Sequence, residues 1–310
     1  MPDKMMQVVR LHDYGGPDKL VLEEAPRPEP TGDQVLIRIK AAGVNPADWK
    51  IGRGLYKQFS PLQFPWTPGL EGAGVVEKVG PDVKMFRPGQ EVYGALSGAY
   101  ATYAVVKESD IQLKPKGISF REAAAVPVGV LTAWGAALNT AQVKRDQHVL
   151  VHGAAGGVGN YALQLARWKG AHVIGTASSP NRDLVLSLGA ELVIDYKATA
   201  FETVVHDLDA VIDTVGGDLA ARSFKVLKPG GIYVTVAGRL PEGAGKAEGV
   251  RATGAGRAPA ETLRQISELI ESQHIRPVVG KVFSLSEAAN AQALSETGHG
   301  RGRIILLTQN

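Results

Sequence analysis

Four glycines within seven residues form the part of this chain whose pattern is best suited to binding chemistry. The run from Gly153 to Gly159 follows a short apolar segment, Val149 to Val151. A residue without a Cβ lets the backbone approach an anion, and the free N–H groups at the start of a helix favour negative charge. The run therefore suits a pyrophosphate group, although such glycines also serve tight packing of a helix on a sheet.

The residues on both sides of this turn predict the elements that would position it. Apolar residues at three- and four-residue spacing predict a helix with one apolar face. They are Val158, Tyr161, Leu165 and Trp168. The apolar run His172 to Ala177 then predicts a second strand. Strand, turn, helix and strand in this order form half of a dinucleotide-binding unit, so we expect the pyrophosphate to contact Ala155, Gly156, Gly157 and Val158.

The residues after the second predicted strand favour NADPH over NADH. A site for NADH usually carries Asp or Glu there, which accepts hydrogen bonds from the ribose hydroxyls. This chain has Ser178, Ser179 and Arg182 instead, and hydroxyls and a guanidinium suit a 2′-phosphate. The alternative for Arg182 is an ordinary solvated helix residue, and Asp183 places an acid nearby. Ser179 before Pro180 is also typical of a helix N-cap.

Composition limits the classes of function. A chain of 310 residues is long enough for two domains, and a net charge of +3 without a long basic run argues against a nucleic-acid partner. The first residues lack the apolar stretch of a signal peptide and no segment is apolar enough to span a bilayer, so we expect a cytoplasmic protein without membrane contact. The absence of cysteine excludes disulfides, thiolate catalysis and cysteine-ligated zinc.

The chain divides into two regions with different patterns of predicted secondary structure, which together predict an α/β fold. Short strand-like runs separated by Pro and Gly indicate a compact β-rich domain in the first 120 residues. These runs are Val35 to Lys40, Gly74 to Val79, Glu91 to Tyr93 and Tyr100 to Val106. Buried-strand patterns then alternate with helices, which is typical of a doubly wound parallel sheet. These strands are Leu192 to Asp195, Ala210 to Asp213, Ile232 to Val236 and an edge strand, Val250 to Thr253.

Helix signals complete the predicted organisation. Capping-box patterns at Ser119 and Ser284 predict helix starts, and helices are expected over Leu131 to Asn139 and Ala260 to Ser272. The terminal strand Arg303 to Leu307 is expected to return to the first domain. We therefore expect a β-rich domain of residues 1–120 together with 274–310, and a cofactor domain of residues 121–273.

Several motifs together give a specific resemblance. They are AAGVNPADWKIGRG (Ala41 to Gly54), TPGLEGAGVV (Thr67 to Val76), VPVGVLTAWGAAL (Val126 to Leu138), VHGAAGGVG (Val151 to Gly159), VIDTVGG (Val211 to Gly217) and TGHGRGRIIL (Thr297 to Leu306). The chain resembles the medium-chain dehydrogenase/reductase superfamily, in its zinc-independent quinone oxidoreductase (zeta-crystallin-like) branch, and most closely the alkenal/oxoene reductases. The resemblance implies a GroES-like β-rich catalytic domain and a Rossmann domain.

The chain departs from the zinc alcohol dehydrogenases that share this family. Those members carry His where Leu70 stands, and their other main ligand is a Cys, which this chain lacks. We therefore expect no metal. Without a Lewis acid, hydride addition to a conjugated system is favoured over addition to an isolated carbonyl, because conjugation spreads the developing charge onto a distant oxygen.

The resemblance also implies roles for individual residues of the catalytic domain. Asn45 corresponds to a contact with the nicotinamide and the substrate oxygen, and its alternative is a turn residue before Pro46. Lys50 would donate to the developing enolate, or lie at the solvated surface. Tyr56 matches a residue that borders the substrate cleft, and Thr132 one close to the carboxamide and the reacting carbon.

Further cofactor contacts are implied after the later strands. Tyr196 corresponds to a residue near the 2′-phosphate, with the capping of a strand end as its alternative. The crevice at the carboxyl edge of the sheet would be lined by Thr214, Val215, Ala237 and Gly238. Arg303 stands where many relatives have Lys and is expected to contact the cofactor, although basic residues near a terminus are commonly solvated.

These observations predict an NADPH-dependent reductase of α,β-unsaturated carbonyls or quinones, assembled as a homodimer as the family implies. Its proposed catalytic residues are Asn45, Lys50, Tyr56 and Thr132. The alternatives are a reductase specific for quinones and an NADPH-binding protein without physiological turnover.

Overall fold

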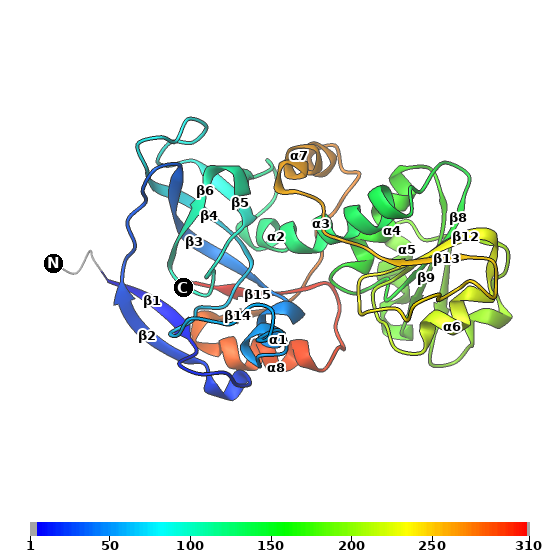
Figure 1. Ribbon diagram of the computed structural model, residues 1–310. Helices are drawn as coiled ribbons and strands as arrows, with labels where there is room; N and C mark the ends of the chain where they lie inside the picture. Colours follow the sequence, from blue (N-terminus) through cyan, green and yellow to red (C-terminus); the bar gives the residue numbers. More distant parts are fainter. Residues whose placement is uncertain (1–4, 309–310) are drawn as a thin grey trace. The chain divides into compact units, whose positions relative to one another are not determined.

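The computed structural model describes residues 5–308, which group into two compact units (Figure 1). The first unit contains the chain up to Val128, Ala260–Glu271 and the chain from Pro277 onwards. The second unit contains Gly129–Pro259 and Ser272–Arg276. The α/β fold class is confirmed, because one unit is built on a mainly antiparallel sheet and the other on a parallel sheet with helices between its strands.

The first unit is built on a seven-stranded sheet with the strand order β14-β15-β3-β4-β5-β7, in which β6 pairs with β3. The strands are β3 (Gln34–Val44), β4 (Glu71–Val79), β5 (Glu91–Ala95), β6 (Tyr103–Lys107), β7 (Ile111–Leu113), β14 (Val279–Ser284) and β15 (Arg303–Leu307). A separate hairpin pairs β1 (Met5–Arg10) with β2 (Val21–Pro26). Alternate residues of β3, such as Val35, Ile37 and Ile39, lie in the core of this unit. Leu36 between them is buried as well, so β3 is covered on both faces over this stretch, and its β-branched residues favour a strand.

The terminal strand returns to the first unit as expected. In β15, Ile304 pairs with Val44 and Leu306 with Ala42 of β3, in antiparallel register. The buried side chains of Ile305 and Leu306 explain why an apolar run so near the end of the chain must pair with a sheet.

Short helices surround the sheet of the first unit. They are η2 (Pro17–Lys19), α1 (Pro46–Gly52), η3 (Glu108–Asp110), α2 (Phe120–Ala124), η7 (Ala260–Thr262), α7 (Leu263–Glu271), η8 (Leu285–Glu287) and α8 (Ala288–Glu296), with α3 (Pro127–Trp134) crossing the boundary between the units. Both predicted capping boxes are confirmed. The Ser119 backbone N–H donates to Glu122, and that of Ser284 donates to Glu287.

The second unit is a doubly wound sheet of parallel strands in the order β10-β9-β8-β11-β12-β13 (Figure 1). Its strands are β8 (His148–His152), β9 (His172–Ala177), β10 (Leu192–Asp195), β11 (Leu208–Asp213), β12 (Leu227–Thr235) and β13 (Arg251–Gly254). Its helices are α4 (Gly159–Trp168), η5 (Ser179–Asn181), α5 (Arg182–Ser187), η6 (Phe201–Thr203) and α6 (Leu219–Phe224), with a π-helical segment η4 (Gly135–Thr140) after α3. The order reverses beside β8, which places a ligand crevice at the carboxyl ends of β8 and β11.

Helix α4 differs from the single apolar face that its spacing predicts. Every residue from Gly159 to Ala166 is buried, including the polar Asn160 and Gln164. Gln164 accepts a hydrogen bond from the Arg276 N–H at 2.7 Å and donates to the Arg276 carbonyl oxygen at 3.2 Å. The segment around Arg276 therefore covers the face that the sequence pattern assigned to solvent, and it satisfies the polar groups there.

The predicted N-cap at Ser179 is displaced by one residue. Ser178 is the N-cap of η5, with Pro180 in its first turn, and α5 begins only at Arg182. The Ser178 hydroxyl oxygen accepts a hydrogen bond from Asn181 at 3.1 Å. Proline is favoured at the first or the second position of a helix. Its presence at position 180 is therefore compatible with an N-cap at either Ser178 or Ser179.

The compact units divide the chain differently from the expected boundaries at residues 120 and 273. Helices α2 and α7 belong to the first unit, together with the start of α3. Tyr93 of β5 holds α7 there, because its hydroxyl donates to the Leu263 carbonyl oxygen at 3.0 Å and lies 2.8 Å from the Ser267 hydroxyl. The Lys116 N–H donates to Glu271 of α7 as well, at 2.9 Å, so contacts with distant segments of the first unit hold this amphipathic helix there.

Candidate cofactor and active-site residues

The glycine turn between β8 and α4 has two kinds of glycine. A Cβ built on Gly159 would lie 2.1 Å from the carbonyl oxygen of Gly153, so Gly159 is fixed by the packing of the turn on itself. A Cβ on Gly156 would meet only the Gly153 oxygen, at 3.2 Å. Tight packing therefore explains Gly159, whereas Gly156 keeps open the space beside the backbone that an anion would approach.

Backbone donors of the turn also fit an anion. The Gly153 and Ala154 N–H groups donate to Thr176 of β9, and the Gly156 N–H donates to the Gly153 oxygen. Within residues 5–308, the N–H groups of Ala155, Gly157 and Val158 donate to no protein group. Unpaired backbone donors before a ten-residue helix are the chemistry that binds a pyrophosphate. The turn therefore fits a dinucleotide, and its contacts remain predictions.

The carboxyl ends of β8 and β11 lie side by side, as the ladder that pairs His152 with Asp213 shows. The Thr214 hydroxyl donates to the His152 carbonyl oxygen at 2.8 Å. Buried Asp213 accepts the Val215 N–H at 2.8 Å and the Gly216 N–H at 3.0 Å. Val215 itself is exposed, so this edge carries an ordered loop with its side chains open to a ligand.

The remaining predicted cofactor residues of the second unit lie at the same edge of the sheet. After β12, the Ala237 N–H donates to Thr235 at 3.1 Å, and Gly238 is exposed. The register pairs Ala177 of β9 with Asp195 of β10, so Ser178 and Tyr196 follow neighbouring strand ends. These positions share one edge because the carboxyl ends of parallel strands lie on the same side of the sheet, as the alternation of strands and helices in the sequence predicts.

The predicted phosphate end of the site is open to solvent. Ser179 and Arg182 are exposed, and the exposed fraction of Tyr196 is 54%. An NADH site usually carries Asp or Glu directly after this strand. In this chain the first carboxylate after β9 is the exposed Asp183, six residues beyond the end of the strand.

His152 is a buried group at this edge that the sequence did not single out for a role. Its Nδ1 lies 3.2 Å from the Thr176 hydroxyl and its Nε2 3.0 Å from the Ser223 hydroxyl. Burial lowers the pKa of His152 to about 4, against a smaller opposing effect of Asp213. The imidazole is therefore neutral at physiological pH and links β8 to β9 and α6.

In the first unit, Asn45 lies in a buried polar cluster that the sequence only partly predicted. Asn45 is the N-cap of α1, and its N–H donates to Asp48 at 2.7 Å. Its amide group contacts both Glu71 and Arg303. Asp48 also accepts a hydrogen bond from the Tyr100 hydroxyl at 3.2 Å. Burial raises the pKa of Asp48 to about 6.

Glu71 is the residue of this cluster that sequence reasoning missed. It stands beside Leu70 in the motif that distinguishes the zinc enzymes, and its burial is complete. A carboxylate inside an apolar strand pattern is itself a signal, because buried acids require partners. Arg303 is also buried, so the observed partners of Arg303 are Glu71 and Asn45, and its contact with the cofactor remains a prediction.

The other predicted catalytic residues occupy different environments. Lys50 is half-buried on α1, with its ammonium 5.4 Å from the centre of the Trp49 ring. Tyr56 follows α1 and has an exposed fraction of 46%. Thr132 lies on α3 in the second unit and is half-buried. The structure thus places Asn45, Lys50 and Tyr56 in one unit, on or near α1. That they form one site with Thr132 remains a prediction.

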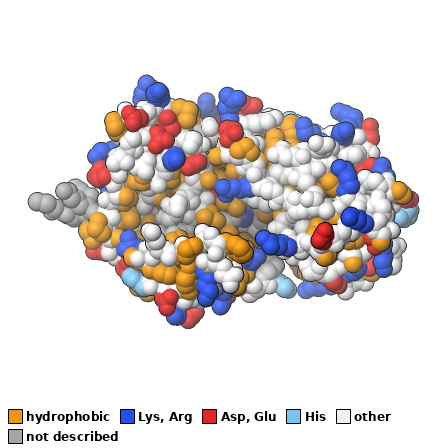
Figure 2. Space-filling model, viewed as in Figure 1, with side chains coloured by type: hydrophobic (Ala, Val, Ile, Leu, Met, Phe, Trp, Pro, Cys, Tyr) orange, Lys and Arg blue, Asp and Glu red, His pale blue; other side chains and the backbone are white. Residues whose placement is uncertain are grey.

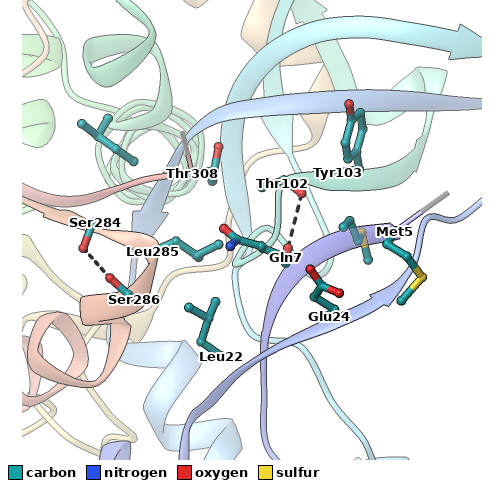
Figure 3. A pocket seen from close by; sticks show the side chains of 12 residues that line it. Met5, Gln7, Leu22, Glu24, Thr102, Tyr103, Ser284, Leu285, Ser286 and Thr308 are labelled. Atoms are coloured by element: carbon teal, nitrogen blue, oxygen red, sulfur yellow. Dashed lines mark hydrogen bonds between the residues drawn. The ribbon is translucent and has the colours of Figure 1, made fainter. Parts of the chain in front are cut away.

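A cavity of about 520 Å³ in the first unit is separate from these residues (Figure 3). Side chains of β1, β2, β6 and η8 line it, together with Ser284 at the end of β14 and Leu307 at the end of β15. None of the predicted site residues contributes to its lining.

Three further features bear on the expected partners. Acidic and basic side chains are interspersed on the face shown in Figure 2. Within residues 5–308, no three His, Asp or Glu side chains form a group that could hold a metal ion. In the same part of the chain, no helix is long and apolar enough to cross a membrane.

Family models match both units. Residues 31–116 match the alcohol dehydrogenase GroES-like domain, and residues 188–306 match the model described as zinc-binding dehydrogenase. At the positions that distinguish the zinc enzymes, this chain has Leu70 and no cysteine.

Individual relatives cover nearly the whole chain. The 2-methylene-furan-3-one reductase of Solanum lycopersicum is 37% identical over 95% of this chain and 77% of its own length. The NADPH-dependent alkenal/one oxidoreductase of Arabidopsis thaliana is 36% identical over 98% of this chain and 80% of its own length. The solved quinone oxidoreductase of Coxiella burnetii superposes with a TM-score of 0.89 at 35% identity, over 99% of this chain and 100% of its own. This chain therefore belongs to the medium-chain dehydrogenase/reductase superfamily, with the quinone oxidoreductases and alkenal/one oxidoreductases.

Proposed function

We propose that this protein is an NADPH-dependent reductase that adds hydride to the conjugated C=C bond of an α,β-unsaturated carbonyl compound, or to a quinone. The observation that carries the proposal is the glycine turn, which is open at Gly156 and has unpaired backbone N–H groups beside it. The names of the relatives agree with it, since they describe a 2-methylene-furan-3-one reductase and an alkenal/one oxidoreductase. An oxidoreductase that uses a nicotinamide dinucleotide follows from the family, and NADPH is the proposed form.

The residues after β9 support NADPH. Ser178, Ser179 and Arg182 offer hydroxyls and a positive charge to a 2′-phosphate, and the first carboxylate after β9, Asp183, comes only after Arg182. Tyr196 follows the neighbouring strand end and supplies a further hydroxyl at this edge. The name of the Arabidopsis relative specifies NADPH, which agrees with this proposal.

The substrate class follows from the donors that the chain offers. When bound, the reduced nicotinamide supplies the hydride. Lys50 and Tyr56 carry N–H and O–H donors on and after α1, and the amide of Asn45 lies at the start of that helix. Such donors suffice for an enolate or a quinol oxygen, on which conjugation has already spread the charge. Tyr56, half-exposed, or solvent then supplies the proton.

The test is consumption of NADPH by the full-length protein, followed by nicotinamide absorbance, with a small enone, an unsaturated aldehyde and a quinone as acceptors. We expect turnover with at least one acceptor, and the ratio of kcat/KM values separates an enone reductase from a quinone reductase. Measurable NADPH binding without consumption in the presence of any acceptor would overturn the proposal in favour of a binding protein. Faster turnover with NADH would overturn the choice of cofactor.

Assembly and location are also proposals. We expect a homodimer joined through β13, the last strand of the parallel sheet, because its outer edge has no partner among residues 5–308. Light scattering on the purified protein tests this. The cytoplasmic location remains a prediction, and the name of the Arabidopsis relative places that protein in the chloroplast.

A further inference from the structure

The first unit contains a buried ion pair between Glu71 of β4 and Arg303 of β15. The exposed fraction is 0% for the Glu71 side chain and 4% for that of Arg303. Among the ion pairs of residues 5–308, it is the one in which both side chains are buried. Burying two charges is costly and often brings no net stability, so such a pair calls for a second explanation.

Both charges contact the side-chain amide of Asn45. The Asn45 Oδ1 accepts a hydrogen bond from Arg303 at 2.7 Å, and its Nδ2 donates to Glu71 Oε1 at 2.8 Å. Rotating the amide by half a turn would place its oxygen against the carboxylate and its N–H groups against the guanidinium. Both contacts would then be repulsive, so the ion pair permits a single orientation of the amide.

The cluster is also anchored on its other sides. The second oxygen of Glu71 accepts the Val128 N–H at 2.7 Å, next to the start of α3. The backbone N–H of Asn45 is fixed by Asp48. Glu71 therefore cannot turn without losing its hydrogen bond to Val128, and the backbone of Asn45 is held in place by Asp48.

A hydrogen-bond inventory shows what remains for a ligand. The amide oxygen of Asn45 is engaged by Arg303, and one of its two N–H groups is engaged by Glu71. The second N–H is the amide's remaining donor. An N–H held in advance is suited to an oxygen that gains negative charge during hydride addition.

We propose that Glu71 and Arg303 are positioning residues, whose ion pair holds the amide of Asn45 so that it presents one N–H donor to the oxygen of the substrate. This inference rests on the proposed function, because it states which group of Asn45 would contact the substrate of that reaction. It changes the expected role of Arg303 from a cofactor contact to the fixing of a substrate donor.

The test compares single and double neutral variants. Glu71→Gln and Arg303→Met each leave one buried charge alone, so each should lower the melting temperature. The double variant removes both charges and should recover most of that loss. The glutamine amide that Glu71→Gln introduces can pair with Asn45 in either orientation, however, so the Asn45 amide is no longer fixed. We therefore expect kcat of the double variant to stay at least about tenfold below wild type, with the KM for NADPH within about twofold.

Two controls separate positioning from structure. Arg303→Lys keeps a cation that can contact the amide oxygen, so it should retain more of kcat than Arg303→Met. The half-exposed pair Glu202 and Arg222 of the second unit receives the same Gln and Met substitutions and should leave kcat unchanged. Recovery of kcat together with stability in the Glu71→Gln, Arg303→Met double variant would overturn the inference.

A readout independent of turnover keeps the inference testable if the proposed function fails. In the ¹⁵N-labelled protein, the side-chain amide signal of Asn45 is assigned by its loss in Asn45→Ala. We expect two widely separated protons in wild type, one of them slow to exchange, and a loss of this protection in the double variant. An unchanged signal in the double variant would show that the ion pair does not fix the amide, whether or not the wild-type protein reduces any acceptor.

Discussion

Gly153 and Gly159 close the glycine turn on each other, since a Cβ on Gly159 would stand 2.1 Å from the Gly153 carbonyl oxygen. Gly156 lies between them in the same turn, and there a Cβ would meet the same oxygen at 3.2 Å, a tight contact that a shift of a few tenths of an ångström would relieve. One motif thus contains a glycine required by the fold and another that leaves room for a ligand.

The two glycines should therefore respond differently to the same substitution. Gly159→Ala should lower the free energy of unfolding by roughly 1–3 kcal/mol, because backbone must move to admit the methyl group. Gly156→Ala should change the free energy of unfolding by less than about 1 kcal/mol. It should nevertheless weaken NADPH binding at least about tenfold. Urea unfolding and calorimetric titration measure the two effects, and unaltered NADPH affinity in Gly156→Ala would remove this turn from the cofactor site.

Arg182 gives a prediction about cofactor choice. Its exposed guanidinium follows Ser178 and Ser179, and a charge-assisted hydrogen bond contributes about 1.5–3 kcal/mol. Arg182→Asp should thus reduce kcat/KM for NADPH by at least about tenfold and leave that for NADH nearly unchanged. Arg264→Asp, at an exposed position of α7, is the control for the change in charge. Equal losses with both cofactors would exclude Arg182 from the phosphate site.

Tyr93 gives a prediction about the division into units. Its buried hydroxyl joins β5 to Leu263 and Ser267 of α7. Tyr93→Phe should lower the free energy of unfolding of the first unit by about 1–2 kcal/mol, because two buried polar groups lose a partner. Tyr103→Phe, whose ring lies under Arg27, should have a much smaller effect. Equal stability of Tyr93→Phe and wild type would show that α7 is held by apolar packing alone.

The sequence predicted those parts of the fold that depend on local pattern. The strands His172–Ala177 and Leu192–Asp195 match the predicted bounds, because short apolar runs between glycines and polar turns have few alternatives. The edge of the sheet that carries Ser178, Tyr196 and Thr214 then followed from the topology of parallel strands.

Contacts between distant segments were beyond the reach of such patterns. Glu71 and Arg303 are 232 residues apart, and nothing in the local spacing of either indicates the other. The burial of Gln164 likewise depends on Arg276, in a segment that joins the second unit from near the end of the chain. A buried polar residue signals that a partner exists, but tertiary structure decides which residue it is.

The last prediction concerns two buried groups that titrate with opposite effects on stability. Burial lowers the pKa of His152 from its ordinary 6.5 to about 4, so between these values the unfolded chain binds more protons and stability falls as the pH drops. Burial raises the pKa of Asp48 from 3.8 to about 6, so the folded state binds more protons in that range and stability rises as the pH drops. Each effect is on the order of 3 kcal/mol when complete, since one pKa unit corresponds to about 1.4 kcal/mol.

Replacing either residue should reveal the contribution of the other to the pH dependence of stability. We expect His152→Gln to lose less stability than wild type, or to gain some, between pH 6.5 and pH 4, because the contribution of Asp48 remains. Asp48→Asn should lose more stability than wild type over the same range, because the proton uptake of the folded state is gone while His152 still favours the acidified unfolded chain. Urea unfolding at several pH values measures the slopes, and the difference between each variant and wild type cancels the contribution of the exposed carboxylates. Parallel curves for wild type and His152→Gln would mean that the imidazole has an ordinary pKa in the folded protein and is reached by water at the end of β8.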